Sequence, residues 1–239
     1  MRMALIVGAL LLVLGGILLL GTHIRRKNAR AEVKRTTHII LIGASIGQAW
    51  NVAEWPHRVG QPGFSAESLA NWRFDKTEAV DEVMIRPARK FRMSRTYLRS
   101  LLQPPPKKPD IIILKECSSY FPGDLSSYKK DIDQWVQRLK PTGAEVILAT
   151  VVPVTEQRAQ QNPGKQESIR EYNDWVRQYS QERGLRVLDL EMALMRADGS
   201  LRSEFAQPDG SHLNATAYGV LDRLLKETLC SRNKKQACS

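Results

Sequence analysis

The chain contains little cysteine and little histidine, with three and four of these residues among 239. No two cysteines form a Cys-x-x-Cys pair and the histidines are scattered, so the sequence has neither a disulfide scaffold nor zinc-site spacing. Cys230 and Cys238 either form a bridge in an oxidising compartment or stay as free thiols in the tail, and the sequence leaves both open. We therefore expect no metal and no other cofactor.

Acidic residues are outnumbered by basic ones, 25 against 36, and the formal net charge is +11. A charge of this sign suits nucleic acid or an anionic membrane surface. No nucleic-acid-binding motif accompanies it, and one basic cluster directly follows an apolar segment, so we expect a juxtamembrane anchor and no nucleic-acid partner. A second basic run indicates either a solvated helix face or a surface for an anionic substrate. The first cluster is Arg25, Arg26, Lys27, Arg30, Lys34 and Arg35, and the second is Arg86, Arg89, Lys90, Arg92, Arg95 and Arg99.

The segment Met3–Gly21 contains no charged residue and consists mainly of Leu, Ile, Val, Ala and Gly. A helix of this length, at about 1.5 Å per residue, spans roughly 28 Å, close to the hydrocarbon thickness of a bilayer. The alternative is a removable signal peptide cut near Ala29-Arg30-Ala31. That site lies beyond a strongly basic stretch, unlike a normal signal-peptide end, so we expect a retained single-pass transmembrane helix.

Short apolar runs alternate with segments of helical periodicity along the rest of the chain. Strands separated by helices pair in parallel through right-handed crossovers, so we expect an α/β fold with a doubly wound parallel sheet. Ligands bind beyond the carboxyl ends of the strands in such sheets. The predicted strands are 38–43, 110–114, 145–152 and 185–190, and the predicted helices are 45–54, 124–140, 166–183 and 215–230.

A serine and a histidine occupy positions suited to catalysis at the carboxyl ends of the predicted strands. Ser45 follows the first predicted strand and opens a helix, so its hydroxyl lies at the mouth of the sheet and its N–H is an unpaired first-turn donor. The structural alternative is a helix N-cap, worth about 1 kcal/mol.

The motif Asp209-Gly210-Ser211-His212 precedes the last predicted helix. Its spacing lets one tight turn hold the carboxylate against Nδ1 of the ring and leaves Nε2 free to take a proton from a serine. An aspartate–glycine turn beside an incidental surface histidine is the alternative.

Several stretches resemble blocks of the SGNH (GDSL-type) esterases. The resemblance covers most of residues 38–230, is strongest at the C-terminal end, and implies a three-layer, flavodoxin-like fold. The domain layout is then a transmembrane helix at 1–24, a basic linker at 25–37, the SGNH-like domain at 38–230 and a basic tail at 231–239. The stretches are Ile39–Ser45, Ile169–Asn173, Gly184–Leu190, Asp198-Gly199, Asp209–Asn214 and Ala217-Tyr218-Gly219.

The resemblance implies that Ser45 is the nucleophile, His212 its base and Asp209 the acid that orients the base. It also implies that Gly63 provides an oxyanion N–H, with Gly60 as the fallback and a simple loop turn as the alternative.

Two positions depart from the pattern of the family. Ala44 replaces an aspartate, and Ser119 occupies the place of an asparagine that supplies an oxyanion donor. Loss of one such donor costs roughly a hundred- to a thousand-fold in rate. Cys117 is either a thiol nucleophile or, more simply, a core cysteine at a strand end.

The resemblance implies a serine hydrolase that cleaves a carboxylic ester through an acyl-enzyme on Ser45, with oxyanion donors on Ser45, Gly63 and Ser119. The apolar N-terminal segment adds the expectation that this enzyme is anchored in a membrane. An acetate on a glycan or a short lipid ester is the expected substrate. Two alternatives remain: an O-acyltransferase acting on envelope glycans, and a catalytically silent binding module. The basic flank favours a cytoplasmic domain, whereas envelope esters lie outside, so the side of the membrane stays open.

Overall fold

The computed structural model describes residues 36–69, 76–89 and 107–230. The predicted transmembrane helix, nearly all of the basic linker and the C-terminal tail lie outside these residues. No helix within the described ranges is long and apolar enough to cross a membrane. Cys230 is disulfide-bonded, and Cys238 lies outside the described ranges.

Five strands form one parallel sheet in the order β2-β1-β3-β4-β5. The strands at its centre are apolar on both faces, as expected for a sheet that is covered on both sides. This confirms the predicted parallel α/β sheet. The strands are β1 (Thr37–Ile42), β2 (Phe64–Ser68), β3 (Ile111–Lys115), β4 (Glu145–Ala149) and β5 (Arg186–Leu188).

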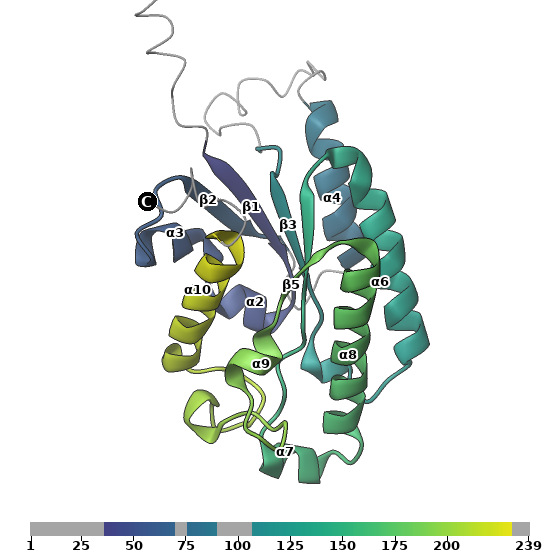
Figure 1. Ribbon diagram of the computed structural model, residues 1–239, viewed down its shortest axis with the longest axis vertical. Coiled ribbons are helices and arrows are strands. Elements are labelled where there is room, and N and C mark those ends of the chain that lie inside the picture. Colours follow the sequence, from purple (N-terminus) through teal and green to yellow (C-terminus); the bar gives the residue numbers. More distant parts are fainter. Residues whose placement is uncertain (1–35, 70–75, 90–106, 231–239) are drawn as a thin grey trace, which may run out of the picture. The chain divides into compact units, whose positions relative to one another are not determined.

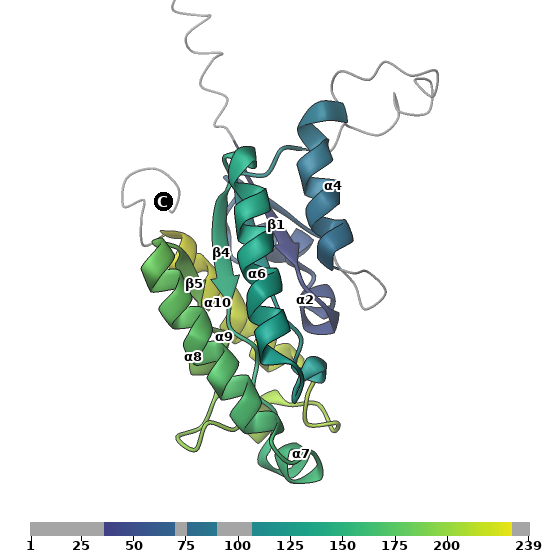
Figure 2. The same ribbon diagram turned by 90° about the vertical axis from the view of Figure 1, so that its right-hand side faces the viewer.

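Alternate strand residues face two separate hydrophobic cores, so helices cover both faces of the sheet (Figures 1 and 2). Ile39 and Leu41 of β1 face one core, whereas Ile40 and Ile42 face the other. Helices α2 (Ser45–Ala49), α3 (Trp55–Arg58), α9 (Leu190–Leu194) and α10 (Ala215–Cys230) pack on the first face. Helices α4 (Lys76–Arg89), α6 (Leu125–Leu139) and α8 (Lys165–Arg183) pack on the second.

Shorter helical turns connect these layers. They are the helix α7 (Glu156–Gln161) and the 3₁₀ turns η1 (Val52–Glu54), η2 (Ser118–Tyr120), η3 (Lys140–Thr142) and η4 (Ser203–Phe205).

One predicted helix is shorter than expected, and one strand and four α-helices had no prediction. The helix expected over 45–54 stops at Ala49, because Asn51 adopts a left-handed conformation with φ of 48° and starts a 3₁₀ turn. Strand β2 has the sequence FSAES, which lacks an apolar run because it lies at the edge of the sheet. The helices α3, α4, α7 and α9 also lacked a prediction.

Arg86 lies on α4 but does not form part of a solvated face. Its side chain is buried and forms ion pairs with Glu67 of β2 and Glu82 of α4. His38, at the start of β1, lies within hydrogen-bond distance of Ser65 Oγ and Glu67 Oε1 at 3.0 and 2.8 Å. These contacts hold β1, β2 and α4 together.

Candidate active site

Ser45 is the first residue of α2, three residues beyond the carboxyl end of β1. Glycine lets this turn pack closely: a Cβ at Gly47 would lie 3.2 Å from Leu41 Cδ2, and one at Gly43 would lie 3.5 Å from Lys115 Cβ. The sheet order reverses between β1 and β3, which is where open α/β sheets bind ligands. The half-buried Ser45 side chain is therefore at the expected binding edge.

The Asp209–His212 turn faces Ser45. Oδ1 of Asp209 accepts the N–H groups of Ser211 and His212 at 3.0 and 2.9 Å, and Oδ2 bonds to Nδ1 of His212. On the other side of the ring, Nε2 of His212 lies 3.2 Å from Ser45 Oγ. The structure thus aligns a hydroxyl, an imidazole and a carboxylate, from residues far apart in the sequence.

The carboxyl of Asp209 is held in its charged form. Partial burial raises its pKa, but hydrogen bonds from the ring and N–H of His212 and from the N–H of Ser211 outweigh this effect. Together they lower the pKa of Asp209 to about 2. An Asp209 carboxylate that is ionised at neutral pH holds the ring of His212 in one orientation through Nδ1.

Helix α10, which follows this turn, is fixed to α2 and α3 by one buried carboxylate. Asp222 accepts hydrogen bonds from Trp50 Nε1 at 2.8 Å and from Arg58 Nε at 2.7 Å, and its carbonyl accepts Trp55 Nε1 at 3.1 Å. Tyr218 of α10 donates to the carbonyl of Ile46 in α2 at 3.4 Å. Because α2 carries Ser45, these bonds set the position of the serine relative to the histidine turn.

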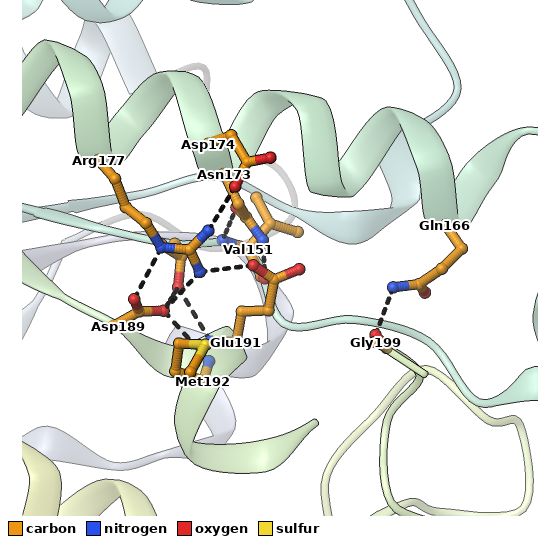
Figure 3. Close-up of polar contacts among 10 residues, drawn as sticks. Val151, Gln166, Asn173, Asp174, Arg177, Asp189, Glu191, Met192 and Gly199 are labelled. Carbon is orange, nitrogen blue, oxygen red and sulfur yellow. Dashed lines mark hydrogen bonds and ion pairs between the residues drawn. The ribbon is translucent and has the colours of Figure 1, made fainter. Parts of the chain in front are cut away.

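A polar network on α8 supports the segment that leads to the histidine turn (Figure 3). Arg177 binds Asp189 at 2.8 Å and Glu191 at 2.6 Å, which anchors the start of α9. Gln166 donates to the carbonyl of Gly199 at 2.6 Å. The loop between α9 and α10 is therefore attached to a long, rigid helix.

The prediction that Gly63 donates to the oxyanion is wrong. Its carbonyl accepts the N–H of Thr37, the first residue of β1, at 2.8 Å, whereas Ser45 lies beyond the other end of that strand. At about 3.3 Å per residue, β1 separates the two by roughly 20 Å. The fallback, Gly60, precedes β2 and lies at the same distant edge.

Ser119 and Cys117 lie at the carboxyl end of β3, the edge that also bears Ser45. Cys117 is buried and its Sγ lies 3.0 Å from Ser119 Oγ. Burial raises the pKa of the Cys117 thiol, but the positive charge of Lys115 and the contact with Ser119 outweigh this and lower it.

Three buried charged residues beside this edge were missed. Lys115 is 1% exposed and donates to the carbonyl of Glu116 at 2.7 Å, and burial lowers its pKa to about 8. Glu116 forms a buried ion pair with Lys76 of α4. The sequence does contain a signal for Lys115 and Glu116. They form a charged Lys-Glu pair directly after the apolar run of β3, where a buried strand meets the ligand-binding edge.

A parallel α/β sheet with an aligned serine, histidine and carboxylate at its carboxyl edge defines a class, the serine hydrolases. The sequence signature of the GDSL-like Lipase/Acylhydrolase family matches residues 41–220, and the chain belongs to this family. It is an ester-hydrolysing serine hydrolase, as the resemblance implied.

Solved structures share the fold. A GDSL-like lipase from Bacteroides thetaiotaomicron aligns with a TM-score of 0.58 and 14% identity, covering 88% of this chain and 97% of its own. A lipase/acylhydrolase from Enterococcus faecalis gives 0.57 and 16%, covering 84% and 100%. A member of the lipolytic G-D-S-L family from Veillonella parvula gives 0.58 and 15%, covering 80% and 97%. No curated protein matches the sequence.

Proposed function

We propose that the protein hydrolyses a carboxylic ester through an acyl-enzyme on Ser45, with His212 as general base and Asp209 as the residue that orients it. The observation that carries the proposal is the 3.2 Å separation between His212 Nε2 and Ser45 Oγ, with Asp209 on the opposite ring nitrogen. This is hydrogen-bond reach for a nucleophile and its base.

In the first half of the reaction, Ser45 Oγ attacks the ester carbonyl while His212 Nε2 takes the hydroxyl proton. The tetrahedral intermediate collapses, the alcohol leaves with that proton, and the acyl group stays on Ser45. Water then attacks the acyl-enzyme, passing a proton to His212, and the carboxylic acid leaves as the proton returns to Ser45.

The oxyanion requires donors at the carboxyl edge of the sheet. The N–H of Ser45 belongs to the first turn of α2, where amides have no carbonyl partner within the helix. The Ser119 hydroxyl, at the end of the neighbouring strand, is the proposed second donor.

Labelling with a fluorophosphonate probe tests the nucleophile. We expect the parent chain to be labelled and Ser45→Ala to be unlabelled. The matched control is Ser211→Ala, which removes a hydroxyl from the same site without touching the proposed proton path. Labelling that persists in Ser45→Ala and disappears in Cys117→Ala would instead identify the thiol as nucleophile.

We also propose that the enzyme is anchored in a membrane by one N-terminal helix. The uncharged stretch 3–21, followed by six basic residues, supports this. Alkaline carbonate should leave the full chain in the membrane pellet and release a chain that starts at residue 36. Release of both would contradict the anchor and leave the proposed catalysis unaffected.

A further inference from the structure

Two basic side chains, Arg158 of α7 and Lys165 at the start of α8, lie beside the proposed catalytic residues. Arg158 packs on the histidine turn, where a Cβ added at Gly210 would lie 3.0 Å from Arg158 Cβ. Lys165 Nζ donates to the carbonyl of Ser118, over 3.0 Å, in the turn η2 that follows β3. Figure 1 shows α7 beyond the same end of the sheet as α2. One cation therefore adjoins the turn that carries His212, and the other adjoins the end of β3.

The two cations are also close to each other. Asn162 links their backbones, because its side chain donates to the carbonyl of Arg158 at 3.1 Å and its own carbonyl accepts the N–H of Lys165 at 3.1 Å. Lys165 is only 7% exposed. Burial lowers the pKa of Lys165, and the neighbouring positive charge of Arg158 lowers it further. Two like charges held together in this way repel each other unless an anion joins them.

Within the described ranges, neither cation is paired with a carboxylate. Arg158 Nη1 contacts the neutral side-chain oxygen of Gln161 at 3.3 Å, and its buried Nε has no hydrogen-bond partner in this part of the chain. Arg177, farther along α8, instead binds three carboxylates. A buried donor without an acceptor is unfavourable, so the guanidinium of Arg158 is suited to an acceptor that a ligand brings.

The charges select the class of ligand. Arginine and lysine bind carboxylate and phosphate groups through short, charge-assisted hydrogen bonds, and arginine can offer two parallel donors. A neutral ligand would leave both charges uncompensated, and a cationic ligand would add a third like charge. The pair therefore favours a ligand that carries a carboxylate or a phosphate.

The position of Arg158 indicates which part of an ester carries this anion. In the proposed mechanism His212 passes the serine proton to the departing alcohol, so the alcohol leaves on the side of the histidine turn. Arg158 packs on that same turn. We propose that Arg158 and Lys165 form an anion-binding subsite, and that the enzyme hydrolyses esters whose alcohol part carries a carboxylate or a phosphate. The inference rests on the proposed catalysis at Ser45, and its two experiments separate the two.

The first experiment measures binding without catalysis. The full chain carrying Ser45→Ala, in an uncharged detergent, is titrated by NMR with 4-acetoxybenzoate, with 4-acetoxyphenyl phosphate and with 4-acetoxybenzamide, the neutral isostere of the carboxylate. We expect at least one anion to bind about tenfold more tightly than the amide. Arg158→Gln should abolish this preference, and Arg158→Lys, which keeps the charge, should retain it. Arg170→Gln removes an exposed arginine elsewhere on α8 and, as the matched control, should change nothing.

The second experiment measures hydrolysis of the same three esters by the chain that keeps Ser45. The ratio of kcat/KM for each anionic ester to kcat/KM for the amide ester should fall about tenfold in Arg158→Gln. Lys165→Gln, which keeps a donor for the Ser118 carbonyl, should act in the same direction. Arg170→Gln should leave the ratio unchanged. High salt should lower the ratio in the parent chain, because it screens the attraction. The anionic ester with the larger ratio identifies the group as carboxylate or phosphate.

Each outcome decides between the ideas. Equal affinity for the anions and the amide, or a preference that survives both Arg158→Gln and Lys165→Gln, would overturn the subsite. A preference for monophenyl succinate over phenyl succinamate, with none among the three acetoxy esters, would place the anion on the acyl part and overturn the assignment to the alcohol. Arg158-dependent binding of an anion by a protein without Ser45-dependent hydrolysis would support the subsite and refute the proposed catalysis.

Discussion

The backbone N–H of Thr155 donates to the carbonyl of Gly210 over 2.9 Å, in the middle of the turn that joins Asp209 to His212. Gly210 has φ of +69°, and a Cβ at this position would overlap Thr155 Oγ1. The histidine turn is therefore pressed against the start of α7, and its geometry depends on a residue without a side chain.

Gly210→Ala should accordingly impair both stability and catalysis. A left-handed conformation costs a non-glycine residue about 1–2 kcal/mol, and the overlap with Thr155 adds to it. Displacement of His212 should lower kcat/KM for an acetate ester at least tenfold. Gly184→Ala is the matched control, because Gly184 has φ of +65° but nothing within 4 Å of an added Cβ. Gly184→Ala should lose stability but keep its activity. An equal loss of activity in both variants would contradict the claim that Gly210 positions His212.

Asp209→Asn tests the role of the ionised carboxylate. The amide keeps the shape of the side chain but removes the charge that stabilises a protonated His212, so kcat should fall by about 10²- to 10⁴-fold. Asp198→Asn provides the comparison, because Asp198, like Asp209, accepts the N–H of a serine two residues later but binds no histidine. Its kcat should stay within about threefold of the parent value. Steady-state kinetics of both variants and the parent on one ester measure this difference in kcat.

The acid sensitivity of the fold should depend on Glu67. Burial raises its pKa, but hydrogen bonds from His38 and Arg86 outweigh this and lower the pKa to about 2. Because the unfolded chain binds this proton near pH 4.5, the stabilisation is complete above that pH and is lost as the pH falls toward 2. Urea unfolding should show that Glu67→Gln is less stable than the parent at pH 6 and that the difference shrinks below pH 4.5. A constant difference across this range would exclude the titration of Glu67 as its cause.

The general position of the site was predictable from local patterns. An apolar run followed by Gly-Ala-Ser places Ser45 at a strand end, and Asp-Gly-Ser-His forms a tight turn by itself. Since parallel strands present their carboxyl ends at one edge, the two motifs were expected at the same edge. The 3.2 Å contact between them agrees with that expectation.

The position of Gly63 was not predictable in the same way. Recognising that it lies at the edge opposite Ser45 required knowing where β2 begins, and the polar sequence of this edge strand gives no apolar signal. Asp222 escaped notice for a different reason. Its partners, Trp50 and Arg58, lie more than 160 residues away in the sequence, and only the packing of α10 on α2 and α3 brings them together.

Removal of the Asp222 carboxylate should therefore loosen the contact between α10 and α2. Asp222→Ala leaves the indole N–H of Trp50 and the guanidinium of Arg58 without this partner, and the free energy of unfolding should fall by about 2–4 kcal/mol. Asp81→Ala removes one member of the exposed Arg138–Asp81 pair and should cost less than about 1 kcal/mol. Chemical denaturation of both variants measures the difference, and similar values would show that Asp222 acts as an ordinary surface charge.

The proposed role of Ser119 as second oxyanion donor can be tested by comparing it with Cys117, its neighbour at the end of β3. Ser119→Ala removes the hydroxyl, and if this hydroxyl stabilises the oxyanion, kcat should fall by about 10²- to 10³-fold while KM changes little. Cys117→Ala is the informative control, because it removes the thiol 3.0 Å from Ser119 Oγ but no hydroxyl. It should reduce kcat by less than about tenfold, through a less well oriented Ser119. If Cys117→Ala instead costs as much as Ser119→Ala, or if Ser119→Ala leaves kcat unchanged, the second donor is another group at this edge.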